Sequence, residues 1–119
     1  MADVTIKRFD ELESYKGEGR FSYAAKTLGV SAWGMNVLRF PAGWGEYPEH
    51  DHAADGQEEV YVVLEGSATL RAGDETFTLE RGVLARVGPA QKRKLVPGPN
   101  GVTVLAIGGT PGKAYVPKT

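Results

Sequence analysis

Frequent glycine and proline divide this sequence into short apolar runs. The chain of 119 residues holds 16 glycines and 7 prolines, and pairs such as Gly73-Asp74 and Gly88-Pro89 separate successive runs. The runs are rich in β-branched and aromatic residues and recur at intervals of roughly 8–12 residues, which is typical of sandwiches and barrels. A helical protein does not tolerate this density of chain-breaking residues. We therefore expect an all-β fold.

The clearest runs place strands at 33–40, 58–64, 67–71, 76–79, 83–87, 91–96 and 102–107. Residues 1–31 are less regular and predict an N-terminal arm, with an edge strand at 4–6 and a helical turn at 9–15 capped by Asp10. The segment 24–28 is ambiguous between loop and strand. Because no linker or change in composition divides the chain, we expect a single domain over 1–119.

Charge and cysteine content limit the partners and the chemistry. The chain has 14 Lys and Arg against 15 Asp and Glu, a formal net charge of −1, which does not favour binding to nucleic acid or to a membrane surface. Without cysteine it has no disulfide, no thiolate metal ligand and no Cys nucleophile. No signal peptide is visible at 1–10, and no apolar run approaches the ~18 residues of a membrane span. A cytoplasmic protein is expected.

The two histidines of the chain both lie in the tripeptide His50-Asp51-His52. On an extended segment, residues i and i+2 point to the same face, so both imidazoles can contact one ion. Imidazole suits Zn, Fe, Ni or Cu, and a carboxylate from Asp55, Glu58 or Glu59 can complete such a site. From the spacing alone, a metal site and a pair of exposed histidines in a loop remain equally open.

Residues 43–66 resemble the first sequence motif of the cupin superfamily. A glycine at 43 or 45 precedes His50-Asp51-His52, and Glu59 is followed by six residues and then Gly66. Six residues separate His52 from Glu59, where the superfamily usually has three or four. A turn at 53–56 can absorb the extra length. Residues 82–96 resemble the second motif in spacing, but Arg93 stands where the superfamily has its third metal histidine.

The resemblance implies a jelly-roll β-barrel of two packed antiparallel sheets, and it implies a homodimer. It also implies a site for a divalent transition metal such as Fe, Mn, Ni or Zn, with His50, His52 and Glu59 as ligands. Because Arg93 replaces the third histidine, this site is incomplete. Arg93, Gln91 and Tyr61 are then the candidate residues for binding a small-molecule ligand.

Three roles for Arg93 remain open at this point. It can pair with Glu59 and leave a metal-free pocket, or it can bind an anionic substrate beside a metal. It can also be solvated on the outer face with Lys92 and Lys94, although strand alternation places Arg93 on the face of Leu95 instead. Two classes of function remain open as well. If a metal is bound, the protein is a metal-dependent enzyme of the oxygenase or isomerase type. If no metal is bound, it is a non-catalytic binding or sensing module in which Arg93 anchors an acidic ligand.

Overall fold

The computed structural model describes residues 2–116, and its regular structure is almost entirely β, as predicted. In chain order the elements are the 3-10 helices η1 (Phe9–Glu11) and η2 (Tyr15–Gly17), β1 (Phe21–Tyr23), α1 (Ala24–Leu28), β2 (Gly34–Phe40), β3 (Glu58–Ala72), β4 (Glu75–Glu80), β5 (Leu84–Val87) and β6 (Arg93–Gly109). Within these described residues, no helix is long and apolar enough to cross a membrane.

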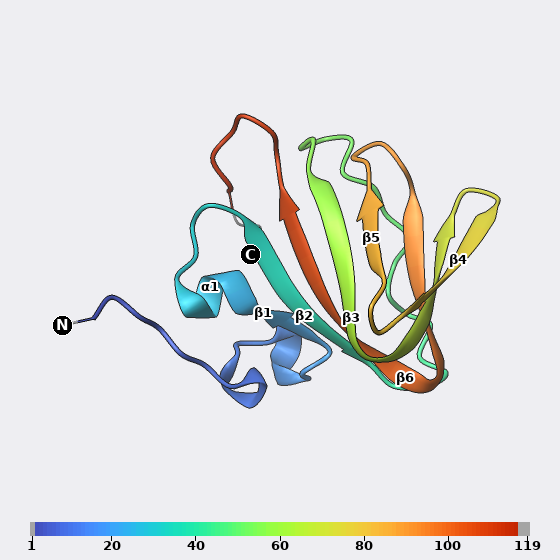
Figure 1. The fold of residues 1–119 in the computed structure, drawn as a ribbon, viewed down its shortest axis with the longest axis horizontal. Coiled ribbons are helices and arrows are strands. Elements are labelled where there is room, and N and C mark those ends of the chain that lie inside the picture. Colours follow the sequence, from blue (N-terminus) through green and yellow to red (C-terminus); the bar gives the residue numbers. More distant parts are fainter. Residues whose placement is uncertain (1, 117–119) are drawn as a thin grey trace.

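The six strands form one antiparallel sheet in the order β1-β2-β6-β3-β4, and β5 pairs with β3 as well. The predicted all-β barrel of packed antiparallel layers is confirmed. The two layers are continuous with each other, because the two longest strands, β3 and β6, run through both halves of a single sheet that bends back on itself (Figure 1). The two halves face each other across the core, which gives the barrel shape.

The bend falls at Gly66 of β3 and at residues 98–101 of β6. The register between the two strands shifts between Gly66 and Ala68. Gly66 has a φ of +72°, and a Cβ at this position would clash with the carbonyl oxygen of Gly101. Only glycine permits both this backbone conformation and this close approach. The runs at 58–64 and 67–71 are therefore two arms of one bent strand, not separate strands, and β6 likewise joins 91–96 to 102–107.

The hydrophobic core fills the space between the two halves of the sheet. Leu38 and Val104 come from one half and Leu95 from the other, and all three side chains are fully buried. Burying a side chain of this size stabilises a protein by about 1.5–3 kcal/mol. Glu59, paired with Gly108, lies seven residues before Gly66 along β3, at the end of the barrel away from the bend.

The N-terminal region differs from its prediction. Residues 4–6 form no strand, and the 9–15 turn is two 3-10 helices, the first of which follows Arg8 and not Asp10 as its capping residue. Residues 24–28 are a helix, neither loop nor strand, because the buried Ala24 and Ala25 are small helix formers that pack against β2. Gly29, with a φ of 82°, ends that helix. The arm before η1 extends away from the barrel in Figure 1.

Candidate metal centre

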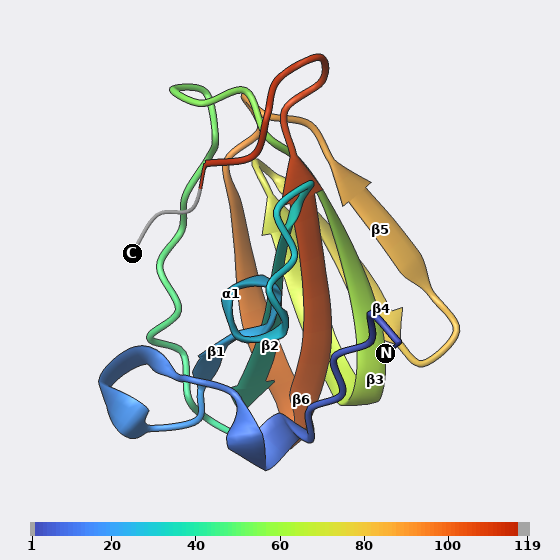
Figure 2. The same cartoon turned by 90° about the vertical axis from the view of Figure 1, so that its left-hand side faces the viewer.

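The segment that carries both histidines is held against the start of β6. It belongs to the connection between β2 and β3, shown in green in Figure 2, which runs along the side of the barrel. His50 and Arg93 exchange backbone hydrogen bonds of 3.0 and 2.9 Å, and the His52 amide donates to the Pro89 carbonyl at 2.8 Å. Residues 50–52 are thus extended, as their spacing requires, with both imidazoles beside the end of the barrel that contains Glu59.

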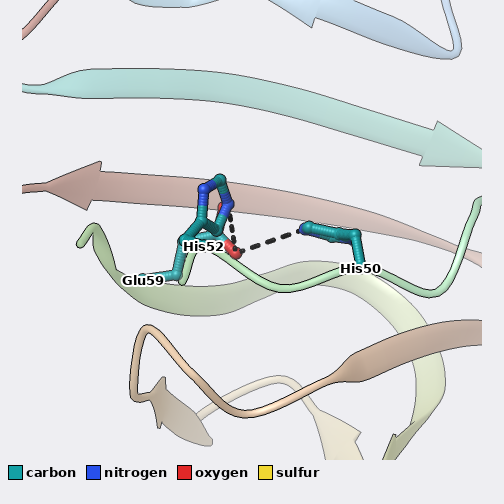
Figure 3. Close-up of side chains that lie close together, drawn as sticks. All are labelled: His50, His52 and Glu59. Carbon is teal, nitrogen blue, oxygen red and sulfur yellow. Dashed lines mark ion pairs between the residues drawn. The ribbon is translucent and has the colours of Figure 1, made fainter. Parts of the chain in front are cut away.

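His50, His52 and Glu59 converge on one point (Figure 3). The Nε2 atom of His50 lies 3.8 Å from Glu59 Oε1, and the Nε2 atom of His52 lies 3.7 Å from the same oxygen. One ligand atom from each residue lies within 4.8 Å of the other two. The structure therefore brings together the three residues that were expected to hold a metal.

The outer nitrogen of each imidazole faces a hydrogen-bond acceptor. His50 Nδ1 lies 3.1 Å from the Pro48 carbonyl oxygen, and His52 Nδ1 lies 3.2 Å from both carboxylate oxygens of Asp55. With the proton on Nδ1, the Nε2 lone pair of each ring is directed toward Glu59. Metal-binding histidines are oriented by this kind of outer contact. Two imidazole nitrogens and a carboxylate oxygen, each so oriented, are a donor set that fits a divalent transition metal.

Asp55 was a candidate ligand in the sequence, but the structure places it behind His52. The turn that carries it is fixed by two hydrogen bonds. The Gln57 amide donates to Asp55 Oδ1 at 3.1 Å, and the Thr110 hydroxyl, from near the end of the chain, donates to the Asp55 carbonyl at 2.8 Å. The extra residues between His52 and Glu59 therefore contribute a positioning carboxylate.

Tyr61 and Arg93 both contact Glu59 from the protein interior. The Tyr61 hydroxyl donates a hydrogen bond of 2.7 Å to Glu59 Oε1, and Arg93 Nη2 lies 3.4 Å from the same oxygen. Both side chains are fully buried, and neither lines the cavity described below. The structure therefore places both of these candidate ligand-binding side chains against Glu59 and outside the lining of the cavity. The solvated role for Arg93 on the outer face is excluded by its burial.

Gln91 lies apart from this cluster. Its side chain is exposed and donates to the Lys92 carbonyl at 2.9 Å, and it borders a groove next to β4 and β5. The predicted strand at 91–96 begins only at Arg93, so Gln91 belongs to the preceding turn and does not share the inward alternation of Arg93 and Leu95.

The charges of the cluster are mutually stabilising. Burial alone would raise the pKa of Glu59, but the interactions with His50 and Tyr61 and the charges of His52 and Arg93 outweigh it and lower that pKa. The Glu59 carboxylate in turn raises the pKa of His50, against the opposing effect of burial. Burial, followed by the negative charge of Glu59, raises the pKa of Tyr61 above its ordinary range. Glu59 is therefore held as a carboxylate and Tyr61 as a neutral hydroxyl.

A cavity of about 920 Å³ opens beside His50, His52 and Glu59. Part of its lining comes from residues 15–26, which include Lys16, Arg20 and Tyr23. The sequence did not identify these residues as functional, because the N-terminal region has no periodic pattern and its packing is set by contacts with β2. The cluster can therefore contact a small molecule inside the cavity.

Comparison with known proteins identifies the fold. No family model and no curated protein matches the sequence. Among solved structures, a cupin protein from Bacteroides fragilis has a TM-score of 0.74 at 19% identity and covers 99% of this chain and 93% of its own. A sugar phosphate isomerase of the cupin superfamily from Silicibacter pomeroyi has a TM-score of 0.69 at 18% identity, covering 87% and 74%. KdgF from Halomonas sp. has a TM-score of 0.58 at 14% identity, covering 65% and 67%. The chain has the fold of the cupin superfamily.

Proposed function

We propose that this protein binds a small organic molecule beside a divalent transition metal held by His50, His52 and Glu59. The observation that carries the proposal is the convergence of both Nε2 atoms on Glu59 Oε1, at 3.8 and 3.7 Å. Both outer nitrogens face acceptors, which favours the tautomer that leaves Nε2 available. The cavity on which this cluster borders has the size of a small-molecule site.

A bound metal would act as a Lewis acid on a ligand oxygen or support oxygen chemistry, because two histidines and one carboxylate leave coordination positions open. The other side chains of the site would position the metal ligands. Tyr61 and Arg93 hold the Glu59 carboxylate in place, and Asp55 orients His52. An isomerase or oxygenase type of reaction is consistent with these parts. The similarity to a sugar phosphate isomerase supports the isomerase type.

A second candidate function is metal-free binding or sensing of a small molecule. It is favoured by the position of Arg93, whose Nη2 atom lies 3.4 Å from Glu59 Oε1. Arginine keeps its proton under ordinary conditions, so its charge partly neutralises Glu59 and repels a cation nearby. Under this alternative the cluster is a network of ion pairs, and the cavity works without a metal.

Metal analysis of protein prepared without an affinity tag separates the two functions. The first predicts about one equivalent of transition metal per chain, either as purified or after dialysis against Fe(II), Mn, Ni or Zn. The double variant His50→Ala/His52→Ala should lose that metal. The matched control Asp51→Ala, between the two ligands in sequence, should retain it. If no metal binds wild-type protein after all four dialyses, the first function is wrong and the second is favoured.

We also propose that the protein is a homodimer. The extended N-terminal arm leaves Val4 and Ile6 with 69% and 83% of their surface exposed, and a neighbouring copy would remove this apolar surface from water. Light scattering on a size-exclusion column should give twice the chain mass for wild type and the chain mass for Val4→Asp/Ile6→Asp. A monomeric wild type at the same concentration would contradict the proposal.

A further inference from the structure

The guanidinium of Arg20, the residue before β1, also lines the cavity. Its guanidinium carbon lies 5.3 Å from the ring centroid of Trp44, which lines the cavity as well. An arginine stacked on an indole has its planar fork held in one orientation. The guanidinium of Arg20 is therefore pre-oriented toward the cavity that His50, His52 and Glu59 also line.

A continuous series of ring contacts joins Arg20 to His50, one of the three candidate metal ligands. Trp44 packs on Phe40 with ring centroids 4.8 Å apart, and Phe40 packs on Tyr47 at 5.0 Å. Tyr47 then meets the ring of His50 edge-on at 5.5 Å. Of the aromatic side chains in this region, Trp44, Tyr47 and Phe21 line the cavity, and this apolar surface favours a ligand with an apolar body.

The existing partner of Arg20 is easily displaced. Among the described residues, its side chain has one ion pair, between Nη1 and Glu18 Oε2 at 3.0 Å, and both side chains are substantially exposed. An exposed pair of this kind contributes about 0–1 kcal/mol. Within residues 2–116, the neighbouring cavity residue Lys16 has no ion pair, while Lys26 is paired with Glu13. Since Glu18 and Glu46 also line the cavity, selectivity must come from the fixed position of Arg20 and not from an overall positive charge.

We propose that Arg20, stacked on Trp44, binds the carboxylate or phosphate of an organic anion whose apolar body lies along Trp44, Phe21 and Tyr47. This proposal depends on the proposed function in one respect: the other end of the ligand is placed at His50, His52 and Glu59. The sequence pointed to Arg93 as the anchor for an acidic ligand, but that side chain is buried behind Glu59. Among residues 2–116, Arg20 is the arginine that lines the cavity.

The test uses the Trp33→Phe background, in which Trp44 is the remaining tryptophan and reports binding next to Arg20. Fluorescence titrations are carried out in EDTA with benzoate, phenyl phosphate and the neutral benzamide. Benzoate, phenyl phosphate or both should bind more tightly than benzamide, and the preference between them identifies the anionic group. Arg20→Gln should weaken the preferred anion roughly tenfold or more, the loss expected for a charge-assisted hydrogen bond. Benzamide binding should not change.

Two further variants keep the test decisive. Glu18→Gln removes an exposed competing carboxylate and should tighten anion binding. Arg81→Gln alters an exposed turn arginine outside the cavity and should have no effect. Equal affinity for benzamide and both anions, no saturable anion binding, or unchanged affinity in both Arg20→Gln and Glu18→Gln would overturn the proposal. Because EDTA removes any metal, the anion titration is independent of metal binding. A negative anion titration does not contradict metal binding at the histidines, and a failure to bind metal does not change the result of the anion titration.

Discussion

Arg93 Nη2 lies 3.4 Å from Glu59 Oε1, the same carboxylate oxygen that both histidine Nε2 atoms face. A permanent cation thus occupies the interior side of the candidate metal ligand, in the sequence position where cupins usually have a histidine. Its Nε and Nη2 atoms are buried without a hydrogen-bond partner among the described residues, and the contact of Nη2 with the Glu59 side chain is an ion pair. We therefore expect the charge of this arginine to weaken metal binding at the three residues.

Removing the charge of Arg93 should strengthen metal binding. Arg93→Met keeps most of the side-chain volume while deleting the positive charge beside Glu59, so we expect Zn²⁺ or Mn²⁺ to bind roughly tenfold more tightly. Arg93→Lys is the matched control and should keep the wild-type affinity within a few-fold. The measurement is competition with a metal-sensitive dye. A folded Arg93→Met protein whose affinity equals that of wild type would show that Arg93 does not influence the site.

The hydrogen bond from Tyr61 to Glu59 should contribute to stability. Tyr61→Phe removes a buried donor and leaves Glu59 with one fewer partner, which we expect to lower the free energy of unfolding by about 1–2 kcal/mol. Tyr47→Phe is the control, because the Tyr47 hydroxyl has no hydrogen bond among residues 2–116. Urea unfolding of the metal-free proteins measures both. Equal effects of the two substitutions would mean that the Tyr61 hydroxyl has no special role.

Asp55 should act on metal binding through His52. Asp55→Ala removes the carboxylate that faces Nδ1, so the His52 ring loses its orientation, and we expect metal affinity to fall roughly 10–100-fold. Asp51→Ala removes a nearby carboxylate that accepts from the Ala53 amide and should change the affinity little. Zn²⁺ titration calorimetry compares the variants. If the two substitutions cost the same affinity, the orienting role of Asp55 is disproved.

The metal-free protein should lose the stabilising contribution of His50 as pH rises. The Glu59 carboxylate raises the pKa of His50 in the folded state above its ordinary value of 6.5. The contribution is fully present below 6.5 and declines as pH passes through the raised value. The stability difference between wild type and His50→Gln, measured by urea unfolding in EDTA, should therefore be larger at pH 6 than at pH 8.5. A difference that grows with pH would reverse the sign of the predicted interaction.

The bend in the sheet should depend on Gly66. Gly66→Ala adds a Cβ at a φ of +72° and against the Gly101 carbonyl, so we expect a loss of more than about 2 kcal/mol. Gly45→Ala is the control, since an added Cβ there meets no atom and the backbone is not left-handed. Thermal unfolding followed by circular dichroism provides the comparison. A tolerated Gly66→Ala would mean that the bend does not require glycine.

The β class was predictable because short runs of β-branched and aromatic residues are local signals. The spacing of His50 and His52 alone left the metal site open, and Glu59 was identified as the third ligand only through the resemblance to the cupin motif. The continuity of β3 through Gly66 was missed because a glycine that ends a strand and one that bends a strand look alike in sequence. Arg20 was missed for a different reason. Its place in the cavity depends on stacking with Trp44, twenty-four residues away in the sequence, and no local pattern links the two residues.

The most direct test of the central claim is anomalous X-ray diffraction from crystals grown without an affinity tag and soaked in Zn²⁺ or Mn²⁺, with data collected above and below the metal absorption edge. The account predicts one strong anomalous peak per chain, with His50 Nε2, His52 Nε2 and a Glu59 oxygen each at about 2.0–2.2 Å. No peak at these three residues, while His50 still faces the Glu59 carboxylate and Arg93 remains beside it, would contradict a metal centre.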